Sequence, residues 1–186
     1  MPAAADSSFD VAIWFCDRAL HENSYLQPQK LHRLLYVSQA FFAVEHGGRK
    51  LMPSIFVADH MGPIEPNIYR AFANGRPNIE TWPLPEEAEA FLEAIWERYS
   101  KHTTDHLSKT LMKHRPFLNA FKRGAGAEIS LDDMMTFYGQ FNRKPKKKDK
   151  PKHPVEELHP DKPTLLVSQS GKPVSVTKWV PGQKPG

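Results

Sequence analysis

The sequence has little of what disulfide-stabilised or membrane-inserted proteins need. It contains a single cysteine, Cys16, in 186 residues, so an intrachain disulfide is impossible and a reducing compartment is expected. No uninterrupted apolar run approaches the roughly 20 residues that a membrane-spanning helix takes. Residues 1–8 hold neither the basic stretch nor the apolar segment of a secretory signal. We therefore expect a soluble, cytoplasmic protein with no membrane partner.

Catalytic and metal-binding signatures are missing as well. The chain has no His-Glu-x-x-His, no Gly-x-Ser-x-Gly, no Gly-x-x-x-x-Gly-Lys and no dinucleotide-binding glycine pattern. Of its nine histidines, His102 and His106 come closest to a metal pair, since they lie four residues apart beside Asp105. Two imidazoles without a clear third ligand are more often a solvated helix face than a metal site. We therefore expect no metal, no cofactor and no enzymatic activity.

Spaced apolar residues and helix caps predict a folded helical body. Hydrophobic residues make up 40% of the chain, too many for a wholly disordered protein. One predicted helix begins at Ser7-Ser8, and others extend from Pro28 to Gly47-Gly48, from about Pro66 to Ala73 and over residues 86–99. The helical spacing of apolar residues continues over residues 107–112 up to Pro116, and a last helix begins at Ser130. Residues 55–59 favour a short extended segment. The predicted fold class is mainly α, a compact helical domain with a short extended element.

The apolar spacing also predicts which helix faces are buried. In the first helix Phe9, Ile13, Cys16 and Leu20 recur at helical spacing, and Cys16 is then a small buried hydrophobe rather than a reactive thiol. In the second helix one broad apolar face is formed by Leu31, Leu34, Leu35, Ser38, Phe41 and Phe42.

Charge divides the chain near Asn142. Residues 143–186 carry 11 Lys+Arg against 4 Asp+Glu, whereas the first 142 residues carry 14 against 17. The Lys- and Pro-rich segment cannot bury enough apolar surface to offset the entropy of ordering. We interpret residues 1–141 as the helical domain, 142–163 as a linker and 164–186 as a C-terminal tail. Within this basic, flexible tail, apolar residues on both sides of Ser170-Gly171 predict a small β-hairpin.

Two stretches of the body carry a more specific pattern. Residues 30–39 read KLHRLLYVSQ and residues 61–72 read MGPIEPNIYRAF. In this order they resemble the Panacea domain, a family with a Lys-Leu-Gln-Lys-Leu-Leu-Tyr-Tyr helix, then Tyr-Gly-Pro-Val, then a short helix containing Tyr-Arg. The likeness extends over residues 9–140. The residues that depart from the family pattern are His32, Arg33, Val37, Met61, Phe117 and the pair Leu111-Met112, which replaces a Thr-His.

The resemblance implies a helical domain that serves as the antitoxin of a bacterial toxin–antitoxin system. SocA-like members neutralise a toxin by direct binding and deliver it to the protease ClpXP, so the implied partners are a cognate toxin and a ClpXP-type protease. The motif residues that become candidates for partner binding are Lys30, Arg33, Tyr36, Gly62, Pro63, Tyr69 and Arg70. Tyr36, Tyr69 and Arg70 are the better candidates because their polar ends suit a surface, whereas Gly62-Pro63 is more typical of a required turn.

The Lys-rich segment predicts an alternative function. Seven of the ten residues 143–152 are basic, and such a segment can bind the phosphates of a nucleic acid or a ribosome with an affinity that falls with salt. No aromatic residue that could stack on bases interrupts it, and a Lys/Pro segment of this kind is more often a solubilising spacer. The lysines in question are Lys144, Lys146, Lys147, Lys148, Lys150 and Lys152.

Overall fold

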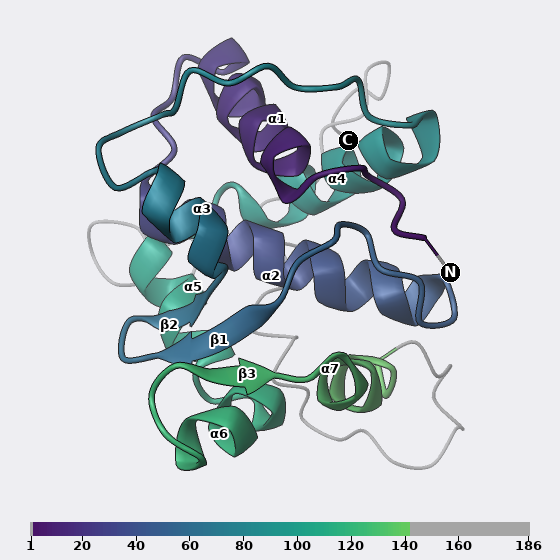
Figure 1. Cartoon of the computed structure of the whole chain (residues 1–186), viewed down its shortest axis with the longest axis vertical. Coiled ribbons are helices and arrows are strands. Elements are labelled where there is room, and N and C mark those ends of the chain that lie inside the picture. Colours follow the sequence, from purple (N-terminus) through teal and green to yellow (C-terminus); the bar gives the residue numbers. More distant parts are fainter. Residues whose placement is uncertain (1, 142–186) are drawn as a thin grey trace, which may run out of the picture.

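The computed structural model describes residues 2–141, and within them the protein is mainly helical (Figure 1). The helices are α1 (Ser8–His21), α2 (Pro28–Glu45), α3 (Pro66–Ala71), α4 (Glu86–Tyr99), α5 (Thr104–Leu111), α6 (Arg115–Lys122) and α7 (Leu131–Tyr138). A small antiparallel sheet, in the order β2-β1-β3, contains β1 (Phe56–Asp59), β2 (Gly62–Ile64) and β3 (Ala127–Ile129). The predicted fold class is confirmed. The predicted linker and hairpin lie outside the described residues.

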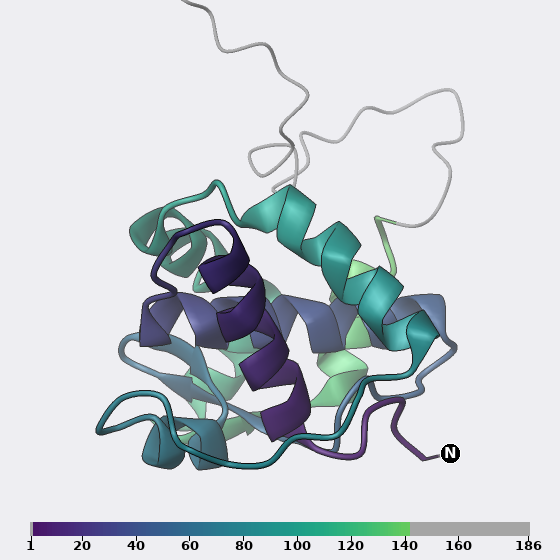
Figure 2. The ribbon, with the colours of Figure 1, turned by 90° about the horizontal axis from the view of Figure 1, so that it is seen from above.

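Helix α2 runs through the middle of the molecule, and the other elements surround it (Figures 1 and 2). Pro28 occupies its first turn, where the missing N–H costs nothing. Beyond its last turn Gly47 and Gly48 adopt positive φ angles of 60° and 95°, which glycine tolerates best. Every residue from Leu31 to Ala43 is buried, so α2 is enclosed on all sides and has no solvent face over most of its length.

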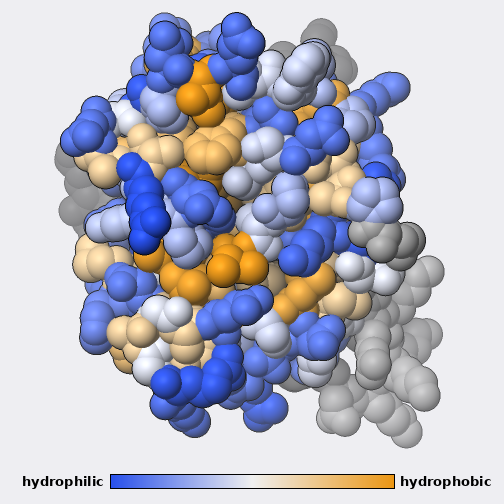
Figure 3. Space-filling model, in the orientation of Figure 1, coloured by the Kyte–Doolittle hydropathy of each residue, from blue (hydrophilic) through white to orange (hydrophobic). Residues whose placement is uncertain are grey.

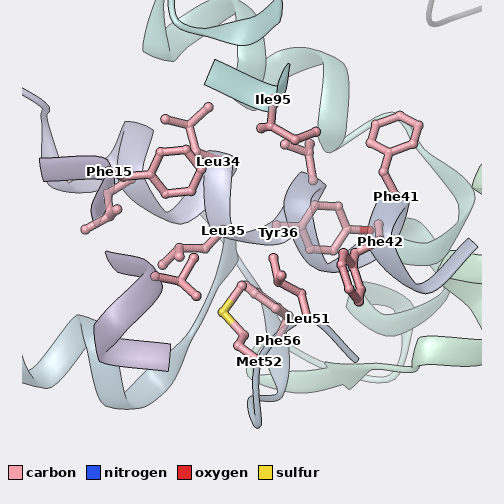
Figure 4. Close-up of a cluster of buried hydrophobic side chains, with 14 of the residues drawn as sticks. Phe15, Leu34, Leu35, Tyr36, Phe41, Phe42, Leu51, Met52, Phe56 and Ile95 are labelled. Atoms are coloured by element: carbon pink, nitrogen blue, oxygen red, sulfur yellow. The ribbon is translucent and has the colours of Figure 1, made fainter. Parts of the chain in front are cut away.

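The hydrophobic core forms where α2 meets α1, α4 and the sheet. Figure 4 shows Tyr36 and Phe42 of α2 beside Ile95 of α4 and Phe56 of β1. The Tyr36 ring meets the Phe56 ring edge-on, with 5.5 Å between their centroids, a favoured geometry for aromatic pairs. The core therefore joins segments that are far apart in the sequence.

Helix α1 begins as predicted but buries only part of the predicted stripe. The Ser7 hydroxyl accepts a hydrogen bond from the backbone N–H of Phe9 at 3.1 Å, which caps the helix. The predicted stripe was wrong at its end, because Leu20 is 57% exposed. The face that packs against the core includes Val11, Ala12, Phe15 and Ala19. Two alanines let the helix approach its neighbours closely, and a search for large apolar residues overlooks them.

The predicted extended segment forms β1, which is one of three strands in the sheet. Asp59 pairs with Gly62 and Val57 with Ile64, so His60 and Met61 form a two-residue hairpin loop. Strand β3, which was not predicted, pairs Phe56 with Ile129. It contains three residues, too few for an alternating pattern to emerge.

The C-terminal third also differs from the prediction at Pro116. Pro116 was expected to end a helical stretch, but it lies in the first turn of α6, where proline is tolerated. The predicted capping residue Ser130 is confirmed: its hydroxyl accepts from the Asp133 N–H at 3.1 Å. No helix in the described part of the chain combines the length and apolarity that a membrane crossing requires.

Candidate partner-binding surface

The two motifs lie in contact with each other through Arg33. From α2, its guanidinium donates hydrogen bonds to the carbonyl of Pro63 at 2.7 Å, to the carbonyl of Met61 and to the Ser108 hydroxyl at 2.9 Å. Pro63 has no N–H, and its carbonyl lies on the outer edge of β2, where another strand would otherwise bind. We call Arg33 with these three partners the Arg33 cluster. It joins α2, the β1–β2 hairpin and α5.

Gly62 is required by this cluster. Its φ angle is +114°, a conformation that side chains rarely adopt. In addition, a Cβ atom at this position would lie 2.8 Å from the Arg33 Cζ. The Gly-Pro sequence is therefore explained by a close approach of the hairpin backbone to a buried arginine.

His32, the neighbour of Arg33, holds the next segment of the second motif. Its Nδ1 accepts from the Glu65 N–H at 3.3 Å, and Glu65 caps α3 by accepting from the Ile68 N–H at 2.5 Å. Burial, helped by the nearby charge of Arg33, lowers the pKa of His32 to about 4. The imidazole is therefore neutral near pH 7, and its proton is on Nε2 because Nδ1 is the acceptor.

The structure divides the seven predicted partner-binding residues into two groups. Tyr69 is 59% exposed, and Arg70 is also exposed. Lys30 is partly buried and donates to the carbonyl of Ser100. The other four, Arg33, Tyr36, Gly62 and Pro63, are buried.

The prediction of a surface position for Tyr36 is therefore wrong. Its side chain has no exposed area, and its ring packs against those of Phe56 and Tyr138. Arg33 is only 1% exposed, so in this conformation it is a structural residue rather than a surface contact. Both corrections have one cause: α2 is surrounded on all sides, so a polar atom on it does not indicate a solvent-facing position.

Three hollows adjoin one another around the N-terminal end of α2. The motif groove, about 520 Å³, lies between α2, the hairpin and α3, and is lined by His32, Arg33, Asp59, Met61, Ile64, Tyr69 and Phe72 among others. The apolar pocket, about 250 Å³, is lined by residues that include Cys16, Leu20, Tyr25, Leu31, Phe72 and Arg76. The Lys30 hollow, about 900 Å³, includes Tyr25, Lys30, Met61 and Thr104. Met61 and Phe72 each line two of the three.

Exposed apolar side chains lie at the edges of these hollows. Tyr25 is 79% exposed, Leu20 57% and Met61 54%, in addition to Tyr69. In Figure 3, apolar side chains appear among polar ones at the left of the view, over α3 and the β1–β2 hairpin. Sequence reasoning did not nominate Tyr25, Leu20 or Met61 as contacts. The one signal available was the position of Met61 in a hairpin turn, where a large apolar side chain has little to cover it.

The histidines and the cysteine give no sign of a reactive site. His102 precedes α5 and His106 lies within it, with 5.2 Å between their stacked rings. Residues 2–141 contain no group of three His, Cys, Asp or Glu residues that could hold a metal ion. Burial raises the pKa of the Cys16 thiol to about 11, so it stays protonated and unreactive near neutral pH.

Comparisons with known proteins give no family assignment: no family model, no curated protein and no solved structure matches this chain. The six lysines of the alternative function, Lys144 to Lys152, lie outside the described residues. Within the described part of the chain, the candidate binding site is the surface around the N-terminal end of α2, where the hollows and the exposed apolar side chains lie.

Proposed function

We propose that the protein is a cytoplasmic antitoxin that neutralises a toxin by direct protein–protein binding, and that it is a binding module rather than an enzyme. The toxin is held by the surface around the N-terminal end of α2. The observation that carries this proposal is the set of exposed apolar side chains, Leu20, Tyr25, Met61 and Tyr69, at the edges of three adjoining hollows. Grouped exposed apolar residues are characteristic of interaction sites.

The chemistry of this surface suits a protein partner. Tyrosine and arginine supply much of the binding energy at interfaces, and Tyr69 and Arg70 stand exposed on the same short helix. The hollows beside them provide places for side chains of the partner. The resemblance of residues 30–39 and 61–72 to the Panacea domain supports a toxin as the partner.

Co-expression with the product of the neighbouring gene tests the proposal. We expect that product to arrest growth when expressed alone, and to be neutralised by and co-purify with this chain. The double variant Met61→Ala/Tyr69→Ala should lose retention at least tenfold, because both exposed anchors are removed. Trp82→Ala is the matched control, since Trp82 is 74% exposed and lines none of the three hollows. A neighbour that is harmless alone and is not retained would contradict the proposal.

Delivery of the bound toxin to a ClpXP-type protease would be a further step of the same function. Toxin half-life, measured in cells with and without the protease, separates the two forms of neutralisation. An adaptor shortens the half-life only when the protease is present, whereas a simple inhibitor leaves it unchanged.

The alternative function is binding of nucleic acid or ribosomes through the Lys-rich segment. It is favoured by the seven basic residues in positions 143–152. Retention on RNA or DNA that falls steeply between 50 and 200 mM salt, and disappears when residues 143–186 are deleted, would support it.

A further inference from the structure

The motif groove contains a hydrogen-bond donor with no acceptor. His32 is 3% exposed and lines the groove. Its Nδ1 is occupied by the Glu65 N–H, and its Nε2 N–H has no acceptor among residues 2–141. The Nε2 atom is not among the fully enclosed unpaired polar atoms of the described residues, so this N–H is accessible from the groove. The position is therefore suited to a ligand that brings an acceptor atom into the groove.

Positive charge without a carboxylate partner lies around the same groove. Arg33 lines the groove, and Arg70 follows the groove residue Tyr69 on α3; neither has a carboxylate oxygen within 4 Å among the described residues. The hydrogen bonds of Arg33 all go to neutral acceptors, so its buried charge is only partly balanced by Asp59, the one carboxylate that lines the groove. A charge in a low-dielectric interior projects its field further than a solvated one.

The apolar pocket begins at Phe72, which also lines the motif groove. At about 250 Å³ it is smaller than the usual site for a drug-sized molecule, and its size suits one large apolar side chain. Arg76 at its rim is paired with Asp17 at 2.6 Å, so the rim adds no net charge.

We propose that the surface recognises a segment of the partner polypeptide in which an acidic residue lies beside a large apolar one. The carboxylate enters the motif groove and accepts from the Nε2 N–H of His32, in the field of Arg33 and Arg70. The neighbouring apolar side chain enters the apolar pocket. This inference rests on the proposed function, since it specifies what the toxin presents.

The experiment selects ligands without assuming the partner. A random peptide display library is selected on the full chain, and enriched peptides are measured by fluorescence anisotropy. We expect enrichment of Asp or Glu adjacent to Leu, Phe or Trp. Peptides that are basic, or that bind equally well after Asp→Asn and Glu→Gln changes, would overturn the proposal.

Variants of the protein test the two contacts separately. His32→Leu removes the Nε2 donor and should weaken binding of the selected peptides at least tenfold. His32→Gln should stay within about threefold, because a carboxamide both accepts and donates. Where His32→Leu does not fold, Arg70→Glu gives the answer: this exposed change should also cost tenfold, and a peptide with its acid replaced by Lys should recover binding.

The matched control is Arg115→Glu, the same charge change at an exposed position on α6 that lines none of the three hollows. Equal loss with Arg115→Glu and Arg70→Glu would overturn the proposal, because it would indicate attraction by net charge alone. The proposed function fails in a different way: selected peptides would be acidic and depend on His32, yet the neighbouring gene product would not be retained.

Discussion

At the scale of single residues, one close approach explains much of the two motifs. Arg33 lies beneath the β1–β2 turn and binds two of its carbonyl groups. The turn can come this close only because position 62 has no side chain. The identity of both residues follows from one contact between segments that are about 30 positions apart.

Replacing Gly62 with alanine tests this contact. Gly62→Ala should cost backbone strain of about 1 kcal/mol or more plus about 1–3 kcal/mol for displacing Arg33. The control is Gly124→Ala, since Gly124 has a similar φ of +126° but no atom within 4 Å of a built Cβ. Urea denaturation of both variants measures the difference. Equal losses would contradict the close approach.

Two buried histidines predict loss of stability in mild acid. Burial lowers the pKa of His32 and of His114 from 6.5 to about 4. Between these values the unfolded chain binds more protons than the folded one, so the free energy of unfolding falls as the pH is lowered from about 7 towards 4. The expected loss is about 3 kcal/mol for each histidine. Above pH 7 neither histidine makes the free energy of unfolding depend on pH.

Urea titrations at pH 7.5, 6 and 5 measure this effect. His114→Gln is the informative variant. Whatever its stability at pH 7.5, its free energy of unfolding should fall with decreasing pH about half as steeply as that of the unsubstituted chain. His114 is enclosed, with its Nδ1 2.9 Å from the Tyr138 hydroxyl, so no solvent stabilises the positive charge that protonation would place on its ring. An unchanged slope in His114→Gln would contradict the assignment.

At the scale of secondary-structure elements, α2 organises the fold. It packs against α1, α4, α5, α7 and β2, and the Arg33 cluster joins its first half to the hairpin that shapes the motif groove. The groove therefore depends on the position of α2 relative to the hairpin, and a change in the Arg33 cluster should loosen the hairpin before it affects the remote core.

Arg33→Lys tests whether the Arg33 cluster positions the hairpin. A lysine has one nitrogen and cannot reach three acceptors in fixed directions, so we expect a loss of about 2–4 kcal/mol and faster amide exchange over residues 61–65. The control is Arg18→Lys, because Arg18 pairs with Glu22 and Glu93 at a partly exposed position, and such pairs contribute about 1 kcal/mol or less. Similar effects of the two changes would contradict the role of Arg33.

Local signals predicted the elements that local chemistry determines. The caps at Ser7 and Ser130, and the limits of α2 and α4, depend on residues within one turn of each helix end. The predictions that failed concern features that depend on residues far away in the sequence. Leu20 is exposed, and Tyr36 enclosed, because of where other elements pack. Strand β3 exists because β1 is there to pair with it.

The candidate surface was partly predictable for the same reason. The second motif led to Tyr69 and Arg70, which are both exposed, and Tyr69 lines the motif groove. Tyr25 and Leu20 come from the segment before α2, and nothing in their local sequence indicates that they border the same hollows. Only the packing of α1 and α3 against α2 brings them together.

At the scale of the whole molecule, charge is divided between two parts of the chain. Residues 143–186 carry a large basic excess, and the residues before them a small acidic one. If the surface around α2 binds the toxin, deletion of residues 143–186 should leave toxin retention within about threefold of the full chain. Co-purification at 150 mM salt measures this, and complete loss of retention would place the binding site in the deleted part.

The most direct test of the central claim is a hydrogen-exchange footprint of the full chain with and without the bound toxin. We predict slower exchange over residues 24–33 and 58–73, which border the three hollows, and no change over α6 and β3. Protection confined to α6 and β3, or absent from residues 24–33 and 58–73 although the toxin remains bound, would contradict the claim.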